Sequence, residues 1–430
     1  MRRIKGSNIG ELIRLLEKRT EGDTKEAERA VAEILADVKE NGDVALIKYT
    51  EKFDGCMVDS STMRLSEEEA AEAIASLDSE LLRIVEESAE NIREYHTLQK
   101  RSGFTLDRGN GAVLRQIVRP VDVAGIYVPG GKASYPSSVL MNAIPAKVAG
   151  VGRIVMATPA GRDGKLPPLT IAAAKTAGVD EIYKIGGAQA IAAFAYGTET
   201  VPRADVVTGP GNVYVAIAKR MVFGSVGIDM IAGPSEVLVV ADDSANPRYI
   251  AADFLSQAEH DARAACILVT DSEEMADVVE REIYAQAEKL PKKDVVFQSV
   301  GNYGTIVLTK DLAEAAACAN AVAPEHMEIC TKEPEQLLPL VKNAGSVFLG
   351  QYSPEPLGDY FAGANHVLPT NGTARFSSPL SVDDFVKKMS VIEYTEAAFR
   401  EVYGKVGRFA MEEGLAAHAK SAQIRFEEDR

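Results

Sequence analysis

Two polar side chains, Gln257 and His260, have the residue types and the spacing of metal ligands. They lie three residues apart in a segment with helical spacing, so both fall on one side of a helix. Gln257 also lies close to the apolar stripe of that helix, where an unsatisfied amide costs about 1–3 kcal/mol. Two interpretations stay open: a structural capping contact, or a pair of ligands one turn apart. Glutamine alone is an unusual zinc ligand, so the second interpretation needs donors from elsewhere.

Further donors come from two segments nearer the C-terminus. The irregular run 352–366 is rich in proline and glycine and carries Asp359, Asn365 and His366; long irregular segments inside compact α/β domains are uncommon and often functional. Glu413 and His418 lie in a helical stretch of the tail, where a solvent-exposed face is the simpler interpretation of the pair alone. Spacing does not show which donors meet. A set that suits Zn²⁺ and leaves space for a substrate is Gln257, His260, Asp359 and His418.

Acid–base chemistry is suggested by the adjacent residues Glu325 and His326, which follow a proline. In a turn both side chains can reach one cleft and exchange protons with a substrate. Taken alone, a Glu-His dipeptide is a weak signal, and a structural role is its simpler interpretation. Another histidine, His96, lies on a charged helix and is expected at the surface or at an edge.

The pattern of apolar residues, which predicts the elements that position these side chains, changes near residue 117. Before it, apolar residues recur at three- and four-residue spacing in 9–19, 24–39 and 79–100, which predicts helices. After it, alanine-rich segments alternate with short β-branched runs that predict strands at 123–128, 153–157, 181–185, 205–208, 236–240, 265–269 and 304–308. Strand, helix, strand in this order predicts parallel sheets covered on both faces. We expect an α/β fold with two Rossmann-like, incomplete, doubly wound parallel-sheet units, an N-terminal helical region and a C-terminal helical tail.

Three of the predicted strands end in glycine-containing turns that lead towards helices, at 128–132, 185–189 and 208–212. Such turns bring backbone N–H groups close to a phosphate at a helix N-terminus. The dinucleotide fingerprint G-x-G-x-x-G and the Walker sequence are absent from all three, so each turn alone is equally well explained as a tight connection. Their clustering favours a ligand site, because ligands of open parallel sheets bind beyond the carboxyl ends of the strands.

Composition and charge exclude several classes of function. The 430 residues include 47 Lys and Arg against 63 Asp and Glu, a net charge of −16, which argues against nucleic acid or an anionic membrane as the main partner. No apolar run approaches the length needed to span a bilayer, and the N-terminus lacks the apolar core of a signal peptide. The four cysteines form no C-x-x-C pair. We expect a cytoplasmic protein that binds neither nucleic acid nor membranes.

Eight short motifs, in order along the chain, resemble the histidinol dehydrogenase family. Similarity extends from the first helix to the tail and includes 374–380. The motifs are Gly125-Ile-Tyr-Val-Pro-Gly-Gly131, Gly186-Gly-Ala-Gln-Ala190, Gly209-Pro-Gly-Asn212, Ala232-Gly-Pro-Ser-Glu236, Gln257-Ala-Glu-His-Asp261, Pro324-Glu-His-Met-Glu328, Gly358-Asp-Tyr-Phe-Ala-Gly-Ala-Asn-His366 and Glu413-Gly-Leu-Ala-Ala-His418.

The resemblance implies an enzyme that oxidises L-histidinol to L-histidine through histidinal, the last steps of histidine biosynthesis, with two NAD⁺ reduced and one Zn²⁺ per subunit. It implies that Glu325 and His326 are the acid–base pair. It also implies three residue sets. The Zn²⁺ ligands are Gln257, His260, Asp359 and His418; the residues around histidinol are these four with Ser235, His326, His366 and Glu413; the NAD contacts are Tyr127, Gln189 and Asn212.

The family is a homodimer with shared active sites, in which the tail's Glu413 and His418 complete the partner's site. We therefore predict four parts. The first is a helical arm at 1–22, and the second is an α/β domain of 23–127 with 237–370 that carries most of the metal and catalytic site. The third is an α/β domain at 128–236 that contributes to NAD binding, and the fourth is a domain-swapped helical tail at 371–430.

The alternative function is a zinc- and NAD-dependent dehydrogenase of the same family that acts on another amino alcohol or polyol. From a different class, a binding protein for imidazole-containing ligands is disfavoured by the intact Glu325-His326 pair.

Overall fold

The computed structural model describes residues 1–19, 24–130 and 134–427, and its contacts divide the chain into two compact units. Unit 1 comprises Met1–Gln99 with Val121–Phe385, and unit 2 comprises Lys100–Pro120 with Val386–Arg430. Gly131 and Lys132 of the first glycine turn, and the end of the predicted arm at residue 22, lie outside the described residues. Among the described residues, each helix is too short or too polar to cross a membrane.

Unit 1 contains a six-stranded parallel sheet, here called the large sheet. Its strands, in spatial order, are β1 (Arg2–Lys5), β11 (Thr305–Leu308), β10 (Ala265–Thr270), β9 (Glu236–Ala241), β12 (His326–Cys330) and β13 (Ser346–Leu349). The central strands β9, β10 and β12 are buried along their whole length. Strands β9 and β10 are nearly continuous apolar runs because helices cover both faces of a parallel sheet, whereas β12 carries the polar residues His326 and Glu328.

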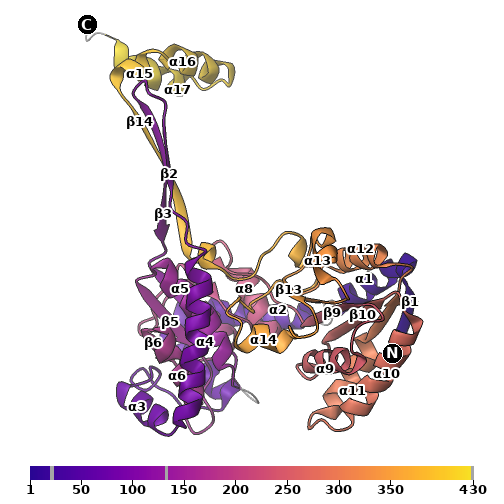
Figure 1. The fold of residues 1–430 in the computed structure, drawn as a ribbon. Helices are drawn as coiled ribbons and strands as arrows, with labels where there is room; N and C mark the ends of the chain where they lie inside the picture. Colours follow the sequence, from indigo (N-terminus) through magenta and orange to yellow (C-terminus); the bar gives the residue numbers. More distant parts are fainter. Residues whose placement is uncertain (20–23, 131–133, 428–430) are drawn as a thin grey trace. The chain divides into compact units, whose positions relative to one another are not determined.

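Alternate residues of β9 enter the two layers of core beside the large sheet. Val237 and Val239 pack with α9 (Pro247–Ala258), α10 (Glu273–Ala287) and α11 (Lys293–Tyr303). Leu238 and Val240 pack on the opposite face with α1 (Ile9–Lys18) and α12 (Leu312–Val322). Figure 1 shows α9, α10 and α11 on one side of this sheet and α1 and α12 on the other. This two-residue period confirms the predicted sandwich of helix, sheet and helix.

A five-stranded parallel sheet, the small sheet, forms the rest of the strand framework of unit 1. Its order is β6 (Glu181–Tyr183), β5 (Arg153–Ala157), β4 (Val123–Tyr127), β7 (Val206–Thr208) and β8 (Gly227–Ile228). Its core includes residues of α5 (Pro136–Ala149), α6 (Pro168–Ala177), α7 (Gly187–Tyr196), α8 (Val213–Val222), α2 (Thr24–Asp54), α3 (Glu67–Ala75) and α4 (Ser79–Thr97). The expected α/β fold with two parallel-sheet units is thereby confirmed. Strand β4 pairs with β5 and β7, so the strand before the predicted boundary at residue 127 is hydrogen-bonded into this sheet.

Two segments predicted as helical contain strands instead. Arg2–Lys5, in the predicted helical arm, forms β1 at the edge of the large sheet and pairs with β11. Val386–Tyr394, in the predicted helical tail, forms β14. The expectation of helix was wrong for these two stretches because a charged strand has no continuous apolar run, so only its pairing partner reveals it.

Unit 2 is a three-stranded antiparallel sheet followed by short helices. β14 pairs with β3 (Ala112–Pro120) from Val386↔Pro120 to Tyr394↔Ala112, and β3 also pairs with β2 (Phe104–Asp107). The helices are α15 (Glu396–Arg400), α16 (Tyr403–Glu412) and α17 (Ala416–Gln423). The Phe426 ring packs on Tyr403 with 4.7 Å between ring centroids. The helical character predicted from Thr395 onward is confirmed.

Candidate active site

The Glu-His pair lies at the amino edge of the large sheet. His326 is the first residue of β12 and stands opposite Val237 of the neighbouring parallel strand β9, whose first residue is Glu236. Ser235, directly before β9, is partly buried. Because parallel strands begin at the same edge of a sheet, these residues gather at one end of two adjacent strands.

The His326 ring is oriented by the main chain of β9. Its Nδ1 lies 3.1 Å from the carbonyl oxygen of Glu236, so Nδ1 carries the hydrogen of this bond. In the neutral ring the lone pair then sits on Nε2, which is buried and has no hydrogen-bond partner. Nε2 lies 3.9 Å from Oε1 of Glu355. His326 is therefore prepared to accept a proton at Nε2.

Glu325 reaches the same place as its neighbour. Its Oε2 accepts a hydrogen bond of 2.8 Å from the backbone N–H of Glu236 and lies 3.7 Å from Nδ1 of His326. Burial raises the pKa of Glu325 well above its usual value, and the charges of Glu236 and Asp359 raise it further. A carboxyl group with a raised pKa is a stronger base once it is ionised, which suits it to take a proton from water.

Three potential metal donors converge beside this pair. Ligand atoms of His260, Glu355 and Asp359 all lie within 4.8 Å of one another. Glu355 and Asp359 lie four residues apart on α14 (Glu355–Tyr360), where a proline in the first turn suits the helix start. Gln257 is almost fully buried at the end of α9, and its Oε1 has no hydrogen-bond partner. An unpartnered buried oxygen one turn before His260 is what a ligand position requires.

Asp359 is held in its ionised form by a neighbouring histidine. Its Oδ1 lies 3.3 Å from Nδ1 of His366. Burial raises the pKa of the Asp359 carboxyl, but the hydrogen bond and charge of His366 outweigh it and leave the pKa below the usual value. His366 thus supports a metal donor from the segment 352–366, where both were predicted. That segment was expected to be irregular throughout, but Asp359 lies on the short helix α14.

The sequence reasoning missed a second group of buried carboxyl groups. Glu355 accepts a hydrogen bond of 2.9 Å from Ser256, and its burial raises its pKa to about 7. Glu328 accepts a hydrogen bond of 2.9 Å from the backbone N–H of Glu355, and its pKa is raised well above normal by burial and by Asp253. Burial likewise raises the pKa of Asp253 to about 6. The sequence held a signal for two of these groups. Glu355 lies one helical turn from Asp359, and Glu328 lies two residues along the strand from His326, so each shares a face with a predicted site residue.

Two other candidates have structural roles. His96 was expected at the surface, but it is fully buried on α4, and its Nδ1 donates to the carbonyl oxygen of Ile92 at 2.8 Å. Asn365 donates to the carbonyl oxygen of Met141 at 2.7 Å and lies 3.2 Å from Nε2 of His96. The His96 prediction was wrong because its helix packs against α5, which the charge pattern of one helix does not show.

The glycine turns lie at the carboxyl edge of the small sheet. The Tyr127 hydroxyl accepts a hydrogen bond of 3.1 Å from the N–H of Gly187, and burial raises the Tyr127 pKa to about 12. Gln189 is 1% exposed, and neither of its amide atoms has a partner. Gly209 has φ 114°, and a Cβ there would collide with the Tyr127 carbonyl oxygen, so only glycine fits. Asn212 is exposed and its side chain caps α8 by accepting from Tyr214 and Val215.

The remaining predicted residues lie in unit 2. Glu413 directly follows α16 as its C-terminal cap and is itself followed by Gly414, which has φ 76°. The next helix, α17, carries His418. Both side chains are exposed within this chain. Glu413 and His418 therefore belong to unit 2. The predicted site residues that the structure brings together in unit 1 are Gln257, His260, Glu325, His326, Asp359 and His366.

Comparisons with known proteins agree with these motifs. The family model described as histidinol dehydrogenase matches residues 17–426. The histidinol dehydrogenase of Geobacillus kaustophilus is 54% identical over 412 residues, covering 96% of this chain and 97% of that protein. The histidinol dehydrogenase of Bacillus subtilis is 54% identical over 410 residues, covering 95% and 96%.

A solved structure shows the same fold. The crystal structure of histidinol dehydrogenase from Elizabethkingia anophelis aligns with a TM-score of 0.88 and 38% identity, covering 92% of this chain and 91% of that chain. The match of the family model and the similarity of these relatives both extend over nearly the whole length, so the resemblance carried by the eight motifs is confirmed. The chain belongs to the histidinol dehydrogenase family.

Proposed function

We propose that this chain oxidises L-histidinol to L-histidine in two NAD⁺-dependent steps through histidinal. The observation that carries the proposal is the placement of His326, with its free Nε2, and Glu325 beside the convergent donors His260 and Asp359. An acid–base pair next to a metal site is what successive alcohol and aldehyde oxidations need. A biosynthetic reaction that draws on the NAD⁺ pool also supports the expected cytoplasmic location.

The donor set fits zinc. Within unit 1, Gln257, His260 and Asp359 supply one amide oxygen, one imidazole and one carboxylate, and the orphaned Oε1 of Gln257 is explained by a cation. We infer that His418 of a second copy supplies the fourth ligand. Zn²⁺ bound there would act as a Lewis acid that holds the amine and imidazole of histidinol in one orientation.

The first oxidation needs a base at the alcohol. His326 accepts the hydroxyl proton at Nε2, because its Nδ1 hydrogen is already donated to the Glu236 carbonyl oxygen. The Glu355 carboxyl group, 3.9 Å away, stabilises the imidazolium that results. The C–H bond of the same carbon breaks as the C=O bond forms, and NAD⁺ bound beside it would supply the hydride acceptor for this step and for the second.

The second oxidation needs water. Glu325 removes a proton from a water molecule as the water oxygen adds to the aldehyde carbon. The aldehyde oxygen takes the proton that His326 accepted in the first step, which gives the hydrate and returns His326 to its neutral form. His326 then takes a hydroxyl proton of the hydrate as the second hydride leaves, which gives the carboxylic acid. The acid loses its remaining proton to solvent, and the product is the carboxylate. Keeping the aldehyde in one site prevents its escape between the steps. We infer that Ser235, His366 and the partner's Glu413 and His418 border the substrate.

The small sheet supports the proposed NAD contacts. Tyr127 is the last residue of β4, and Gln189 and Asn212 follow β6 and β7. All three lie at the carboxyl edge of the sheet, where ligands of parallel sheets bind. The two unpartnered amide atoms of Gln189 are buried hydrogen-bonding groups that a nucleotide would satisfy.

Counting NADH tests the proposal directly. Purified protein with added Zn²⁺ is expected to form two NADH per L-histidinol consumed, because both oxidations occur in one site. Prior removal of metal with a chelator should abolish turnover, and added Zn²⁺ should restore it. One NADH per substrate would instead support an alcohol dehydrogenase of the same family, and tight metal-dependent binding without turnover would support a binding protein.

We also propose that the protein is a homodimer in which each tail completes the partner's site. Several large apolar side chains of unit 2 are exposed within this chain, including Ile392 at 73% and Phe409 at 70%. A segment of this size with its apolar residues uncovered does not stabilise itself, so a second subunit is the natural cover.

Mixed dimers test the shared site. A His418→Ala chain and a Glu325→Gln chain are each expected to form almost no histidine. After equal mixing, unfolding and refolding, half of the dimers are hybrids with one intact site, so roughly a quarter of the wild-type rate should return. The two chains carry tags of different size so that native mass spectrometry counts the hybrids. Hybrid dimers without recovered histidine formation would show that each site is built within one chain.

A further inference from the structure

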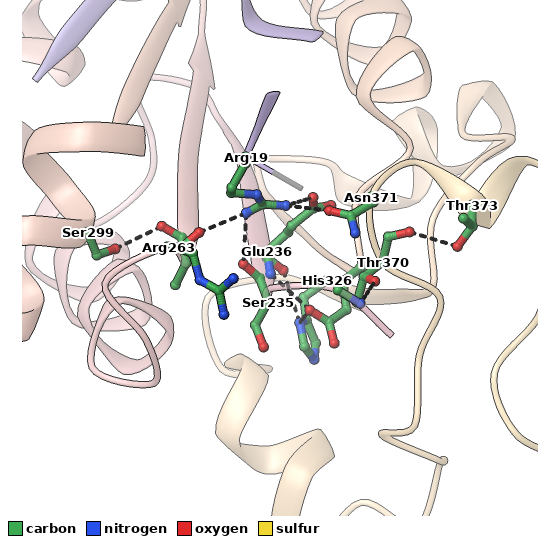
Figure 2. Close-up of polar contacts among 12 residues, drawn as sticks. Arg19, Ser235, Glu236, Arg263, Ser299, His326, Thr370, Asn371 and Thr373 are labelled. Atoms are coloured by element: carbon green, nitrogen blue, oxygen red, sulfur yellow. Dashed lines mark hydrogen bonds and ion pairs between the residues drawn. The ribbon is translucent and has the colours of Figure 1, made fainter. Parts of the chain in front are cut away.

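We propose that Arg19 is a positioning residue for both Glu325 and His326, and that it acts through the main chain of Glu236. The proposal rests on the proposed function, because it concerns the acid–base pair of that reaction. Arg19 directly follows α1, and no motif of the sequence pointed to it. Figure 2 shows its guanidinium group among Ser235, Glu236, Arg263 and Asn371.

The guanidinium group of Arg19 fixes the start of β9. It forms an ion pair with the Glu236 carboxylate, and the two side chains are 0% and 1% exposed. Its Nη1 donates to the carbonyl oxygens of Ser235 at 3.3 Å and of Arg263 at 3.1 Å. One planar cation thus holds the main chain of Ser235 and the side chain of Glu236.

The main chain of Glu236 in turn holds both members of the acid–base pair. Its N–H donates to Oε2 of Glu325 at 2.8 Å, and its carbonyl oxygen accepts from Nδ1 of His326 at 3.1 Å. A shift or rotation of this one residue therefore displaces the water-activating carboxyl group and turns the imidazole together. Among the described residues, no hydrogen bond or ion pair of Arg19 goes to either side chain, so its contacts act through position. The Arg19 charge in addition lowers the pKa of Glu325.

A second segment locks the cation in place. Nη2 of Arg19 donates to Oδ1 of Asn371 at 2.8 Å. Asn371 has φ 55°, a left-handed conformation that asparagine tolerates better than most residues. The backbone N–H of Gly233, two residues before Ser235, donates to the Thr370 hydroxyl at 2.7 Å. Arg19 therefore ties the end of α1, the start of β9 and the turn at 370–371 into one buried network.

Only arginine has the geometry for these contacts. Its fork directs several N–H groups in one plane to a carboxylate, two carbonyl oxygens and an amide oxygen, whereas lysine offers one ammonium group. Burial raises the pKa of Glu236, and the Arg19 charge opposes that shift. Loss of the cation leaves a buried acidic group without a partner next to Glu325, which favours rearrangement of the strand start.

The test compares Arg19→Met, Arg19→Lys and Glu236→Gln dimers in each half-reaction, supplied with Zn²⁺. Arg19→Met should lower kcat roughly 100-fold for both histidinol and histidinal, because a displacement near 1 Å has this effect on rate. The KM for NAD⁺ and the zinc content should stay within about two-fold of wild type, since Arg19 contacts neither site. Arg19→Lys and Glu236→Gln should lie between Arg19→Met and wild type, the partial rescue that positioning implies.

Asp43→Asn is the matched control for loss of stability alone. Asp43 is a buried carboxyl group on α2, 5% exposed, that accepts a hydrogen bond of 2.6 Å from Thr198 and is remote from the acid–base pair in its contacts. At a temperature where both variants are equally folded by circular dichroism, Asp43→Asn should keep the wild-type kcat. Wild-type kcat in Arg19→Met, or an equal loss in Asp43→Asn, overturns the proposal.

Poor folding of Arg19→Met leaves the proposal testable through the other two variants. Wild-type kcat in both folded Arg19→Lys and Glu236→Gln also overturns it. Failure of the proposed function is seen separately, in the unaltered dimer, as one NADH or none per histidinol. If the unaltered dimer forms two NADH per histidinol and the Arg19 variants keep the full rate, only the positioning role of Arg19 is overturned.

Discussion

A Glu325→Gln variant is expected to lose the oxidation of histidinal about 10²–10⁴-fold, the usual contribution of a general base, while histidinol oxidation changes much less. Glutamine keeps an oxygen that can accept from the Glu236 N–H, where the wild-type bond is 2.8 Å, so the local geometry persists. What disappears is the second oxygen, which takes the proton from water. Single-turnover assays started separately from histidinol and from histidinal measure the two steps.

His326→Asn is the contrasting variant, because the proposed function makes His326 the base in both steps. Asparagine removes the lone pair of Nε2, which has no other partner in the structure described here. Both half-reactions should fall together in this variant. Equal losses in the two half-reactions of Glu325→Gln would remove the role assigned to Glu325.

A His260→Ala variant is expected to lose the bound metal and, with it, both oxidations. The imidazole is the one nitrogen donor of the cluster in unit 1, and its removal leaves carboxylate and amide oxygens, which bind zinc more weakly without a nitrogen partner. An affinity loss of at least about 100-fold is expected, since even residues that only support ligands have effects up to that size. Metal content after dialysis, measured by mass spectrometry, checks the loss.

Asp261→Asn is the matched control for the metal experiment. Asp261 directly follows His260. Its side chain is 47% exposed, and its Oδ1 lies 3.2 Å from Nε of Arg263. Asparagine can keep the short hydrogen bond that Asp261 accepts from the Arg263 N–H. This variant should retain zinc and rate. Retention of both by His260→Ala would show that the ligand set is wrong.

The framework of the fold was predictable because burial on two faces leaves its mark in the sequence. Strands such as Glu236–Ala241 consist almost wholly of apolar residues, and the helices between them have helical spacing. Strands β1 and β14 left no such mark, since both are charged and lie in sheets where only pairing defines them.

The candidate site was predictable where the residue type itself was informative. Gln257 is conspicuous on an apolar stripe, and Asp359 and His366 are conspicuous in an irregular segment. Glu355, between two prolines, was not singled out, and its 2% exposure comes from packing that its own segment does not encode. Arg19 and Glu236 lie 217 residues apart, so no local pattern joins them.

The edge at which the site lies could not be predicted by the usual rule. Ligands of open parallel sheets bind at carboxyl ends, and the glycine turns of the small sheet follow that rule. Glu325 and His326 lie instead at the amino edge of the large sheet, where α9 ends after running back across it. A helix that follows a strand returns its last residues, here Gln257, to the edge where that strand began.

The acceptor that orients His326 belongs to the main chain, and this decides which mutations can affect the base. In hydrolases with a Ser-His-Asp triad, one base change in the aspartate codon deletes the orienting group. Here every residue at position 236 supplies the same carbonyl oxygen, so the tautomer of His326 is independent of the side chain encoded there. Variation at position 236 can alter the base only by moving the strand, so a library randomised at that position would report on strand placement.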